Sequence, residues 1–167
     1  MELNVYKIRT GAKLPRRAHK HDAGADIFYC PSEVLDSFLD AHGNVVWNKS
    51  PSDSVKIGPG ESTLVPTGIK IGVPENFMLE VKNKSGIAYK RQLIVGSCVI
   101  DSKYDGEIFV NLHNIGGETQ QIRSGEKIAQ VVLLPISVCK FGEIKDDAVY
   151  GTHTNRGDSG FGSTGDF

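Results

Sequence analysis

The sequence predicts an all-β protein, and three observations support this prediction. The chain contains 15 Val and 14 Ile against 10 Leu and 8 Ala, and β-branched side chains favour strands over helices. Apolar and polar residues alternate in several short segments, as they do in strands with one buried face. Turn residues such as Gly58-Pro59-Gly60 separate these segments. Many short strands divided by turns are typical of a jelly roll, a sandwich or a closed barrel.

The expected strands can be placed along the chain from this alternation. Leu3, Val5 and Ile8 open the sequence with near alternation. The pattern is stricter in residues 67–73 (TGIKIGV), 77–82 (FMLEVK) and 107–113 (EIFVNLH). Each of these segments is therefore expected to bury one face.

Residues 32–56 depart from the alternating pattern. Residues 32–41 carry apolar side chains at helical spacing after a Ser that could cap a helix, which predicts a short amphipathic helix. Residues 43–56, with Trp47 among polar residues, are interpreted as a surface excursion or a short hairpin. The whole stretch 31–56 is expected to be an insertion, either a tolerated surface loop, which is the better interpretation, or a surface for a regulatory protein partner.

Length and charge limit the functional classes. A chain of 167 residues with 39% hydrophobic residues fits one domain with a real core. The formal charge of -1 provides no cationic field for nucleic acid or an anionic membrane. Three cysteines without metal spacing argue against a disulfide framework or a zinc site. No apolar run approaches a membrane span, so an intracellular, cytoplasmic protein is expected.

The Gly-rich end contains a familiar motif whose usual structural surroundings are missing. Residues 160–165 (GFGSTG) fit the GxGxxG pattern, but that fingerprint requires a strand before it and a helix after it. Only two residues follow. Residues 152–167 are expected instead to form a flexible arm on a β domain spanning residues 1–151.

Five segments combine glycines with polar groups and carry the candidate chemistry. In order along the chain they are residues 23–27 (AGADI), 83–88 (NKSGIA), 96–107 (GSCVIDSKYDGE), 125–130 (GEKIAQ) and 156–165 (RGDSGFGSTG). In order and spacing, the sequence resembles the homotrimeric dUTP pyrophosphatases, and the resemblance covers nearly the whole chain. It implies a distorted jelly-roll or β-barrel fold of the β-clip type and hydrolysis of dUTP to dUMP and pyrophosphate.

The resemblance implies roles for the residues around the phosphates. Asp101 matches the general base, and an ionised carboxylate within reach of water can take its proton. Asp26 is implied to hold water bound to Mg²⁺, an ion that needs few direct protein ligands. Phosphate contacts are implied for Lys84, Ser85, Gly86 and Gln130. The alternatives are a turn-capping Asp101, a buried Asp26 that satisfies turn N–H groups, and a solvent-facing Gln130.

The hairpin around Asp101 is implied to select the nucleoside. In the family, main-chain groups of this hairpin read uracil, and unpaired buried groups would reject cytosine. Tyr104 matches the Tyr that lies under the deoxyribose and leaves no room for a 2′-hydroxyl; alternatively it is a core residue. The other implied contacts are Val95, Cys98, Val99, Ile100 and Phe109.

The arm is implied to complete the site. Arg156 would grip the γ-phosphate, Phe161 would stack on uracil, and Gly162, Ser163 and Thr164 would contact phosphates. In the resembled trimers this arm closes over a site built by other subunits, so a homotrimer with shared active sites is expected.

Four residues depart from the family's usual pattern. Lys84 stands where Arg is usual, Lys103 stands where an acidic residue is common, and Glu126-Lys127 replaces Asp-Arg. A Lys supplies a point charge without the planar fork of Arg. Phosphate contact at Lys84 is therefore expected to be looser or to pass to another residue.

Three rival functions stay open. A dCTP deaminase of the same trimeric fold would convert dCTP, although Tyr104 and the arm with Phe161 favour the pyrophosphatase. A catalytically silent regulatory protein would not need Asp101 and Arg156. A bifunctional protein would hydrolyse dUTP and bind a regulator through residues 31–56. If the chain is viral, the nucleus or cytosol of an infected host is the expected location.

Overall fold

The structure is a computed structural model of the chain. It describes residues 1–32, 36–39, 45–48, 53–145 and 149–152. Contacts divide the chain into two compact units, Met1–Ser137 and Val138–Phe167. Among the described residues, every helix and strand belongs to the first unit. The expected boundary at residues 151 and 152 stays a prediction.

The all-β prediction is confirmed. The described residues form short strands and one short helix, which together give a jelly-roll-like fold. In chain order the elements are β1 (Val5–Lys7), β2 (Ala25–Phe28), β3 (Asp36–Leu39), β4 (Val45–Asn48), β5 (Ser54–Ile57), β6 (Ser62–Pro66), β7 (Ile69–Ile71), β8 (Phe77–Lys82), α1 (Ser85–Arg91), β9 (Leu93–Val95), β10 (Val99–Ile100), β11 (Phe109–Asn114), β12 (Gln120–Arg123) and β13 (Lys127–Pro135).

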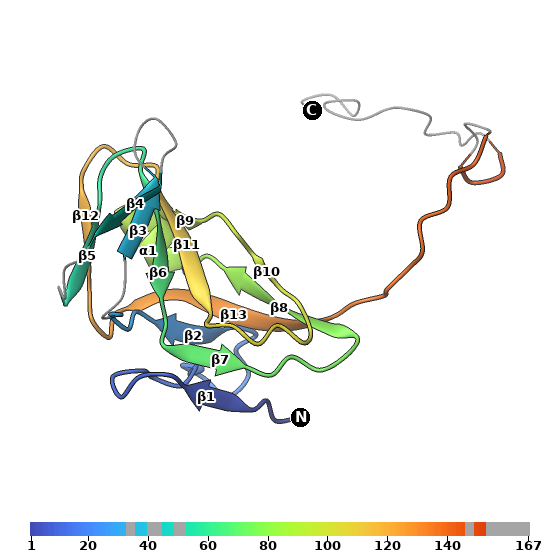
Figure 1. Ribbon diagram of the computed structural model, residues 1–167, viewed down its shortest axis with the longest axis horizontal. Coiled ribbons are helices and arrows are strands. Elements are labelled where there is room, and N and C mark those ends of the chain that lie inside the picture. Colours follow the sequence, from blue (N-terminus) through green and yellow to red (C-terminus); the bar gives the residue numbers. More distant parts are fainter. Residues whose placement is uncertain (33–35, 40–44, 49–52, 146–148, 153–167) are drawn as a thin grey trace. The chain divides into compact units, whose positions relative to one another are not determined.

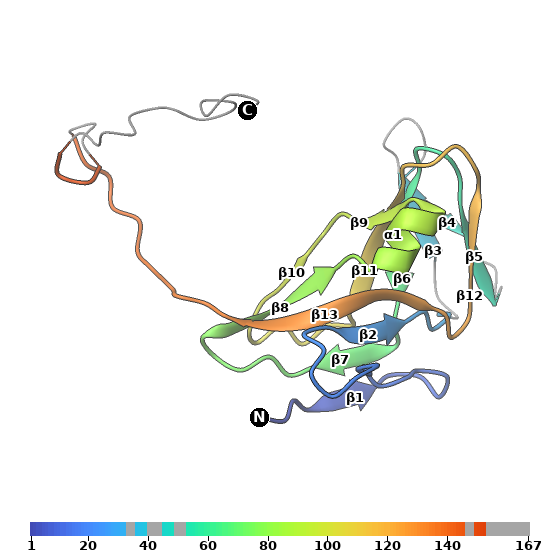
Figure 2. The same ribbon diagram turned by 180° about the vertical axis from the view of Figure 1, so that it is seen from behind.

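Two larger antiparallel sheets position the candidate site. One has the strand order β10-β8-β13-β2 and the other β4-β3-β6-β11-β9, while β1-β7 and β12-β5 form small pairs. Figures 1 and 2 show β2 and β8 on either side of the long β13. The first sheet therefore brings together strands that are far apart in sequence. It also joins the segments that flank the second, third and fourth motifs.

The core lies between these sheets and follows from the alternation in sequence. In β11 the burial alternates along the strand, and Val110, Leu112 and Asn114 point inward. β2 differs because all four of its residues are buried, including Asp26. Both faces of β2 are therefore covered, although β2 is the edge strand of its sheet.

The helix predicted for residues 32–41 is wrong where the structure describes this segment. Asp36–Leu39 is β3, which pairs antiparallel with β4 and also with β6. A short apolar run fits either period, and pairing partners decide between them. The edge of β6 offers backbone hydrogen bonds at Ser62 and Thr63. The hairpin interpreted for residues 43–56 is not confirmed, because β4 pairs with β3, which lies before residue 43, and β5 pairs with β12.

The helix that does form is α1, in the segment of the second motif. Ala88, Lys90 and Arg91 are good helix formers, and the two basic residues lie in the last turn, where they complement the helix dipole. Gln92 ends the helix in the left-handed conformation, with φ of 53°. Gly86 in the first turn obscured this signal in the sequence, because glycine disfavours helices.

Candidate active site

A cavity of about 460 Å³ lies beside the loop that follows β10. Asp101 is exposed and opens a turn in which the Tyr104 N–H donates to the Asp101 carbonyl at 3.4 Å. Five of the predicted site residues line this cavity, namely Val99, Ile100, Asp101, Tyr104 and Phe109. The structure thus gathers the expected base and the expected walls of the nucleoside pocket around one space.

The carboxylate of Asp101 is free to act on a solvent molecule. Within the described part of the chain, no hydrogen bond or ion pair engages its oxygens. The neighbouring charges are engaged elsewhere: Lys103 pairs with Glu75 at 2.8 Å, and Asp105 pairs with Lys70 at 3.2 Å. An unpaired, exposed carboxylate at a cavity wall can accept a proton from water.

A second group of predicted residues surrounds the buried Asp26 on β2. Its Oδ1 accepts a hydrogen bond from Lys84 Nζ at 2.7 Å, and its Oδ2 lies 2.7 Å from Lys127 Nζ. Burial would raise the pKa of Asp26, but the hydrogen bonds from Lys127 and Lys84 outweigh it and hold the pKa below the ordinary value. Asp26 is therefore an anion that holds two ammonium groups.

Gln130 lies next to this group because β13 pairs with β2 in a register that sets Gln130 opposite Asp26. Its Nε2 donates to the Asn83 carbonyl at 2.9 Å. A Cβ on Gly24 would overlap the Gln130 side-chain amide, so any larger residue there would push this side chain aside. Asp26, Lys84 and Gln130, predicted from three separate motifs, thus come together at one place.

Ser85 and Gly86 form the exposed start of α1. Lys84 is the N-cap residue, and no side chain caps the helix. The Lys84 carbonyl accepts from the N–H groups of Ile87 and Ala88, which leaves the earlier N–H groups of the first turn without intrahelical partners. Backbone donors are thus available at the start of α1.

In the first sheet, strand β8 lies between the group around Asp26 and the hairpin that carries Asp101. Gln130 pairs with Lys82, whereas Val99 pairs with Glu80 two residues earlier on β8, a spacing of about 7 Å along a strand. Between them, the Cys98 carbonyl accepts from the Val81 N–H at 2.7 Å. The two groups of predicted residues therefore belong to one sheet and lie on opposite sides of β8.

The remaining predicted residues do not line the cavity or lie outside the described residues. Val95 ends β9, where its N–H donates to Asn83 Oδ1 at 2.7 Å, and Cys98 is half-buried. Neither residue lines the 460 Å³ cavity, nor do Lys84, Ser85, Gly86 and Gln130. Arg156, Phe161, Gly162, Ser163 and Thr164 lie outside the described residues. The roles of all the predicted site residues stay predictions.

Sequence reasoning missed two residues of this arrangement. Lys127 was noted only as a departure from the family's Arg, yet it holds one oxygen of Asp26. Asn83 joins Val95 to Gln130 through its side chain and its carbonyl. The signal for Lys127 was its place in the fourth motif, whereas the register shift between Lys127 and Ala129 is visible only in the structure.

The described residues do not form a metal cage of their own. Groups of three His, Cys, Asp or Glu side chains are absent among them. Ammonium groups lie against both oxygens of Asp26. This donor set fits Mg²⁺ only as an ion that arrives on phosphate groups and keeps most of its water. Within the same residues, no helix is long and apolar enough to cross a membrane.

Comparison with known proteins gives the family directly. A family model described as dUTPase matches residues 49–165. The chain belongs to the dUTPase family. This family assignment accounts for the second to fifth motifs together, all of which lie within the matched residues.

Relatives and solved structures agree with this assignment. A deoxyuridine 5'-triphosphate nucleotidohydrolase of Gloeothece citriformis is 35% identical over 167 residues, covering 99% of this chain and 97% of its own. The dUTPase of Staphylococcus bacteriophage 80alpha, solved with dUpNHpp, has a TM-score of 0.77 at 24% identity and covers 98% of each chain. A mutant dUTPase of S. aureus phage phi11, solved with a structural Mg(II) ion, has a TM-score of 0.69 at 23% identity, covering 87% of this chain and 98% of its own.

Proposed function

We propose that this protein hydrolyses dUTP to dUMP and pyrophosphate, with Asp101 as the general base. The observation that carries the proposal is the exposed, unengaged Asp101 beside Tyr104 on the wall of one cavity, in a chain of the dUTPase family. In this reaction Asp101 takes a proton from water, the water oxygen bonds to the α-phosphorus, and the bond to the bridging oxygen of the β-phosphate breaks. Pyrophosphate leaves with the electron pair of that bond.

Uracil and deoxyribose selection is assigned to the hairpin around Asp101. Main-chain groups of Val95, Cys98, Val99 and Phe109 would read the uracil edge, and Ile100 would be a further contact. Tyr104 would lie under the sugar and leave no space for a 2′-hydroxyl. Unpaired buried groups would then make cytosine costly to bind, which separates this activity from that of a dCTP deaminase.

The triphosphate is assigned to the neighbouring group of residues. Lys84, Ser85, the Gly86 backbone and Gln130 would donate to phosphate oxygens, next to the N–H groups at the start of α1. Mg²⁺ would enter as part of the substrate, where it neutralises phosphate charge. A carboxylate has about four acceptor positions. Lys84 donates to Oδ1 of Asp26, and Lys127 lies 2.7 Å from Oδ2, so Asp26 would use a remaining acceptor position to hold a water of that ion.

The carboxyl-terminal arm and a homotrimer complete the proposal. Arg156 would bind the γ-phosphate, Phe161 would stack on uracil, and Gly162, Ser163 and Thr164 would contact phosphates, with the arm closing over a site shared between subunits. Truncation after Tyr150 is expected to leave a folded trimer with at least about a hundredfold lower turnover, because the lid that excludes water is lost. Light scattering and a pyrophosphate assay measure both effects; unfolding of the truncated chain would show that the arm is structural.

In the cytoplasm the reaction would keep uracil out of DNA and supply dUMP for dTTP synthesis. The first test is pyrophosphate release from dUTP with Mg²⁺, run beside dCTP, dTTP and UTP. Release from dUTP alone is the expected result. Ammonia release from dCTP would favour the deaminase. Absence of any reaction would favour a silent regulatory protein, with the insertion at residues 31–56 as its partner surface.

A further inference from the structure

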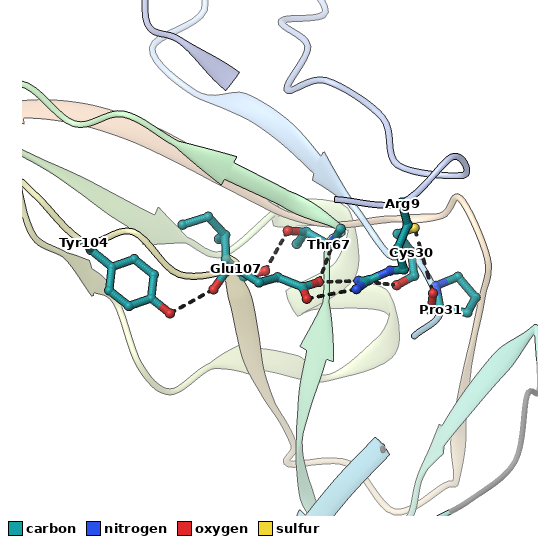
Figure 3. Close-up of polar contacts among 8 residues, drawn as sticks. Arg9, Cys30, Pro31, Thr67, Tyr104 and Glu107 are labelled. Carbon is teal, nitrogen blue, oxygen red and sulfur yellow. Dashed lines mark hydrogen bonds and ion pairs between the residues drawn. The ribbon is translucent and has the colours of Figure 1, made fainter. Parts of the chain in front are cut away.

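Glu107 lines the cavity, and its carboxylate belongs to a polar network with Arg9 (Figure 3). Arg9 meets it as a two-pronged fork: Nη1 donates to Oε2 at 2.9 Å, and Nη2 donates to Oε1. The two side chains are only 21% and 12% exposed. Such bidentate pairs fix the relative orientation of their partners as well as their separation.

Further hydrogen bonds tie this pair to two other segments. The Gly68 N–H donates to Glu107 Oε1 at 2.7 Å, and Arg9 Nη2 also donates to the Cys30 carbonyl at 3.3 Å. Gly68 has φ of 70°, and a Cβ there would come within 2.9 Å of Ala12 Cβ and of Cys30 Sγ. The network therefore joins the turn before β7, the end of β2 and the N-terminal segment to the loop that carries Asp101.

The backbone carbonyl of Glu107 connects this network to Tyr104. The Tyr104 hydroxyl donates to the Glu107 carbonyl at 3.0 Å, and this is its one hydrogen-bond partner among the described residues. The next residue is fixed as well: Thr67 Oγ1 donates to the Ile108 carbonyl at 2.6 Å, and the Ile108 N–H donates to the Ile69 carbonyl at 2.9 Å. Figure 3 shows Tyr104 at one end of this network and Arg9 and Cys30 at the other.

Stability alone is a weak reason for such a pair. A buried ion pair often contributes no more than well-packed apolar side chains of similar volume. Tyr104 is 48% exposed, so apolar packing does not hold its ring alone. The ring lies close over Gly106, where a Cβ would overlap the hydroxyl end of the ring. Its position depends on where the Glu107 carbonyl is held.

We propose that Arg9 and Glu107 are positioning residues that set sugar discrimination by fixing Tyr104 at the cavity wall. The proposal rests on the dUTPase activity proposed above, in which Tyr104 excludes a 2′-hydroxyl. A steric filter acts over fractions of an ångström, so a wall free to shift admits the larger sugar. Arg9 acts through Glu107 and touches no substrate.

The variant Arg9→Lys tests this proposal because it keeps the positive charge and removes the fork. The ratio of kcat/KM for dUTP to that for UTP is expected to fall about tenfold, the size of coupling found within one network. Tyr104→Phe should lower the same ratio, and the double variant should lower it no further than the larger single effect. A purely structural role would lower the melting temperature and leave the ratio unchanged.

A second variant guards against misfolding. Arg9→Met with Glu107→Gln leaves no buried unpaired charge, and the Gln oxygen can still accept from Gly68. It should fold and also lose discrimination. The matched control is Asp105→Asn. Asp105 lies in the same loop as Glu107, and its exposed ion pair with Lys70 is removed. The ratio of kcat/KM for dUTP to that for UTP should stay within about twofold of wild type in this variant. A wild-type ratio in the folded double variant would overturn the proposal.

Binding measurements separate this proposal from the hydrolytic function. The dissociation constants of dUpNHpp and its ribose counterpart are measured by calorimetry for wild type and Arg9→Lys. Suppose that wild type binds dUpNHpp more tightly than its ribose counterpart, and that the ratio of the two dissociation constants is about tenfold smaller in the variant. The positioning role then holds even if no turnover is found. If wild type has no preference, or the variant keeps it in full, Arg9 and Glu107 do not set sugar discrimination.

Discussion

Asp26 and Asp101 are the same residue type in two contrasting regions of the molecule. Asp26 lies in β2 at the edge of a four-stranded sheet, is 5% exposed, and has an ammonium group 2.7 Å from each of its oxygens. Asp101 lies in an exposed loop at a cavity wall, and no described residue engages its carboxylate. The surroundings decide that Asp26 organises its neighbours, whereas Asp101 stays available for a proton.

The difference also separates stability from activity. Removing a buried charge leaves its partners uncompensated and costs several kcal/mol, whereas substitution of an exposed, unpaired side chain costs little. A general base, by contrast, contributes to the rate regardless of its effect on stability. The two carboxylates should therefore respond to substitution in opposite ways.

The largest effect is expected for Asp101→Asn. The amide is nearly the same shape but cannot take the proton, so turnover of dUTP should fall by roughly a thousandfold. The affinity for dUpNHpp and the melting temperature should stay near those of wild type. A pyrophosphate assay and calorimetry measure these quantities. Turnover like that of wild type would mean that another group is the base.

Asp26→Asn should give the opposite result for folding. Two ammonium groups lose their shared anion, so the free energy of unfolding should fall by about 2 kcal/mol. Partial exposure of Lys84 and Lys127 lets both side chains turn toward water, which limits the loss. Urea unfolding at neutral pH measures it. No change in stability would show that the two regions do not differ in the way described.

The same variant makes the contribution of Asp26 visible through pH. Because the pKa of Asp26 is lowered in the folded protein, its ionised form stabilises the fold at every pH above the unfolded value of 3.8, and this contribution is lost as pH falls through the lowered value. The difference in unfolding free energy between wild type and Asp26→Asn should be constant from about pH 5 to 7 and shrink below about pH 4. A difference that grows in acid would contradict the lowered pKa.

A smaller effect is expected at Lys103, in the loop of Asp101. Its φ of 67° is in the left-handed region, which costs a Lys about 1 kcal/mol and an Asn less. Lys103→Asn should therefore raise the free energy of unfolding by up to about 1 kcal/mol, because the ion pair with Glu75 that it removes is exposed. Thermal unfolding measures the gain. A loss of stability would show that the ion pair outweighs the backbone conformation.

The smallest effect is expected for Asp105→Asn. The side chain of Asp105 is 92% exposed and lies 3.2 Å from Lys70, so solvent and salt screen this pair. Stability should change by less than about 0.5 kcal/mol, in contrast to Asp26→Asn. The same urea titration compares the two. Equal losses in both variants would mean that burial is not what distinguishes the carboxylates.

The sequence determined the fold class, the alternation of β8 and β11, and the family. These depend on local periodicity and on motifs that short stretches carry by themselves. Only the tertiary structure decided that Asp36–Leu39 is a strand, since its pairing partners β4 and β6 are not both its neighbours along the chain. It likewise decided that Lys127 holds Asp26 and that Arg9 meets Glu107 across 98 residues. Ion pairs between distant residues leave no periodic signal, because they depend on which strands pair and in which register.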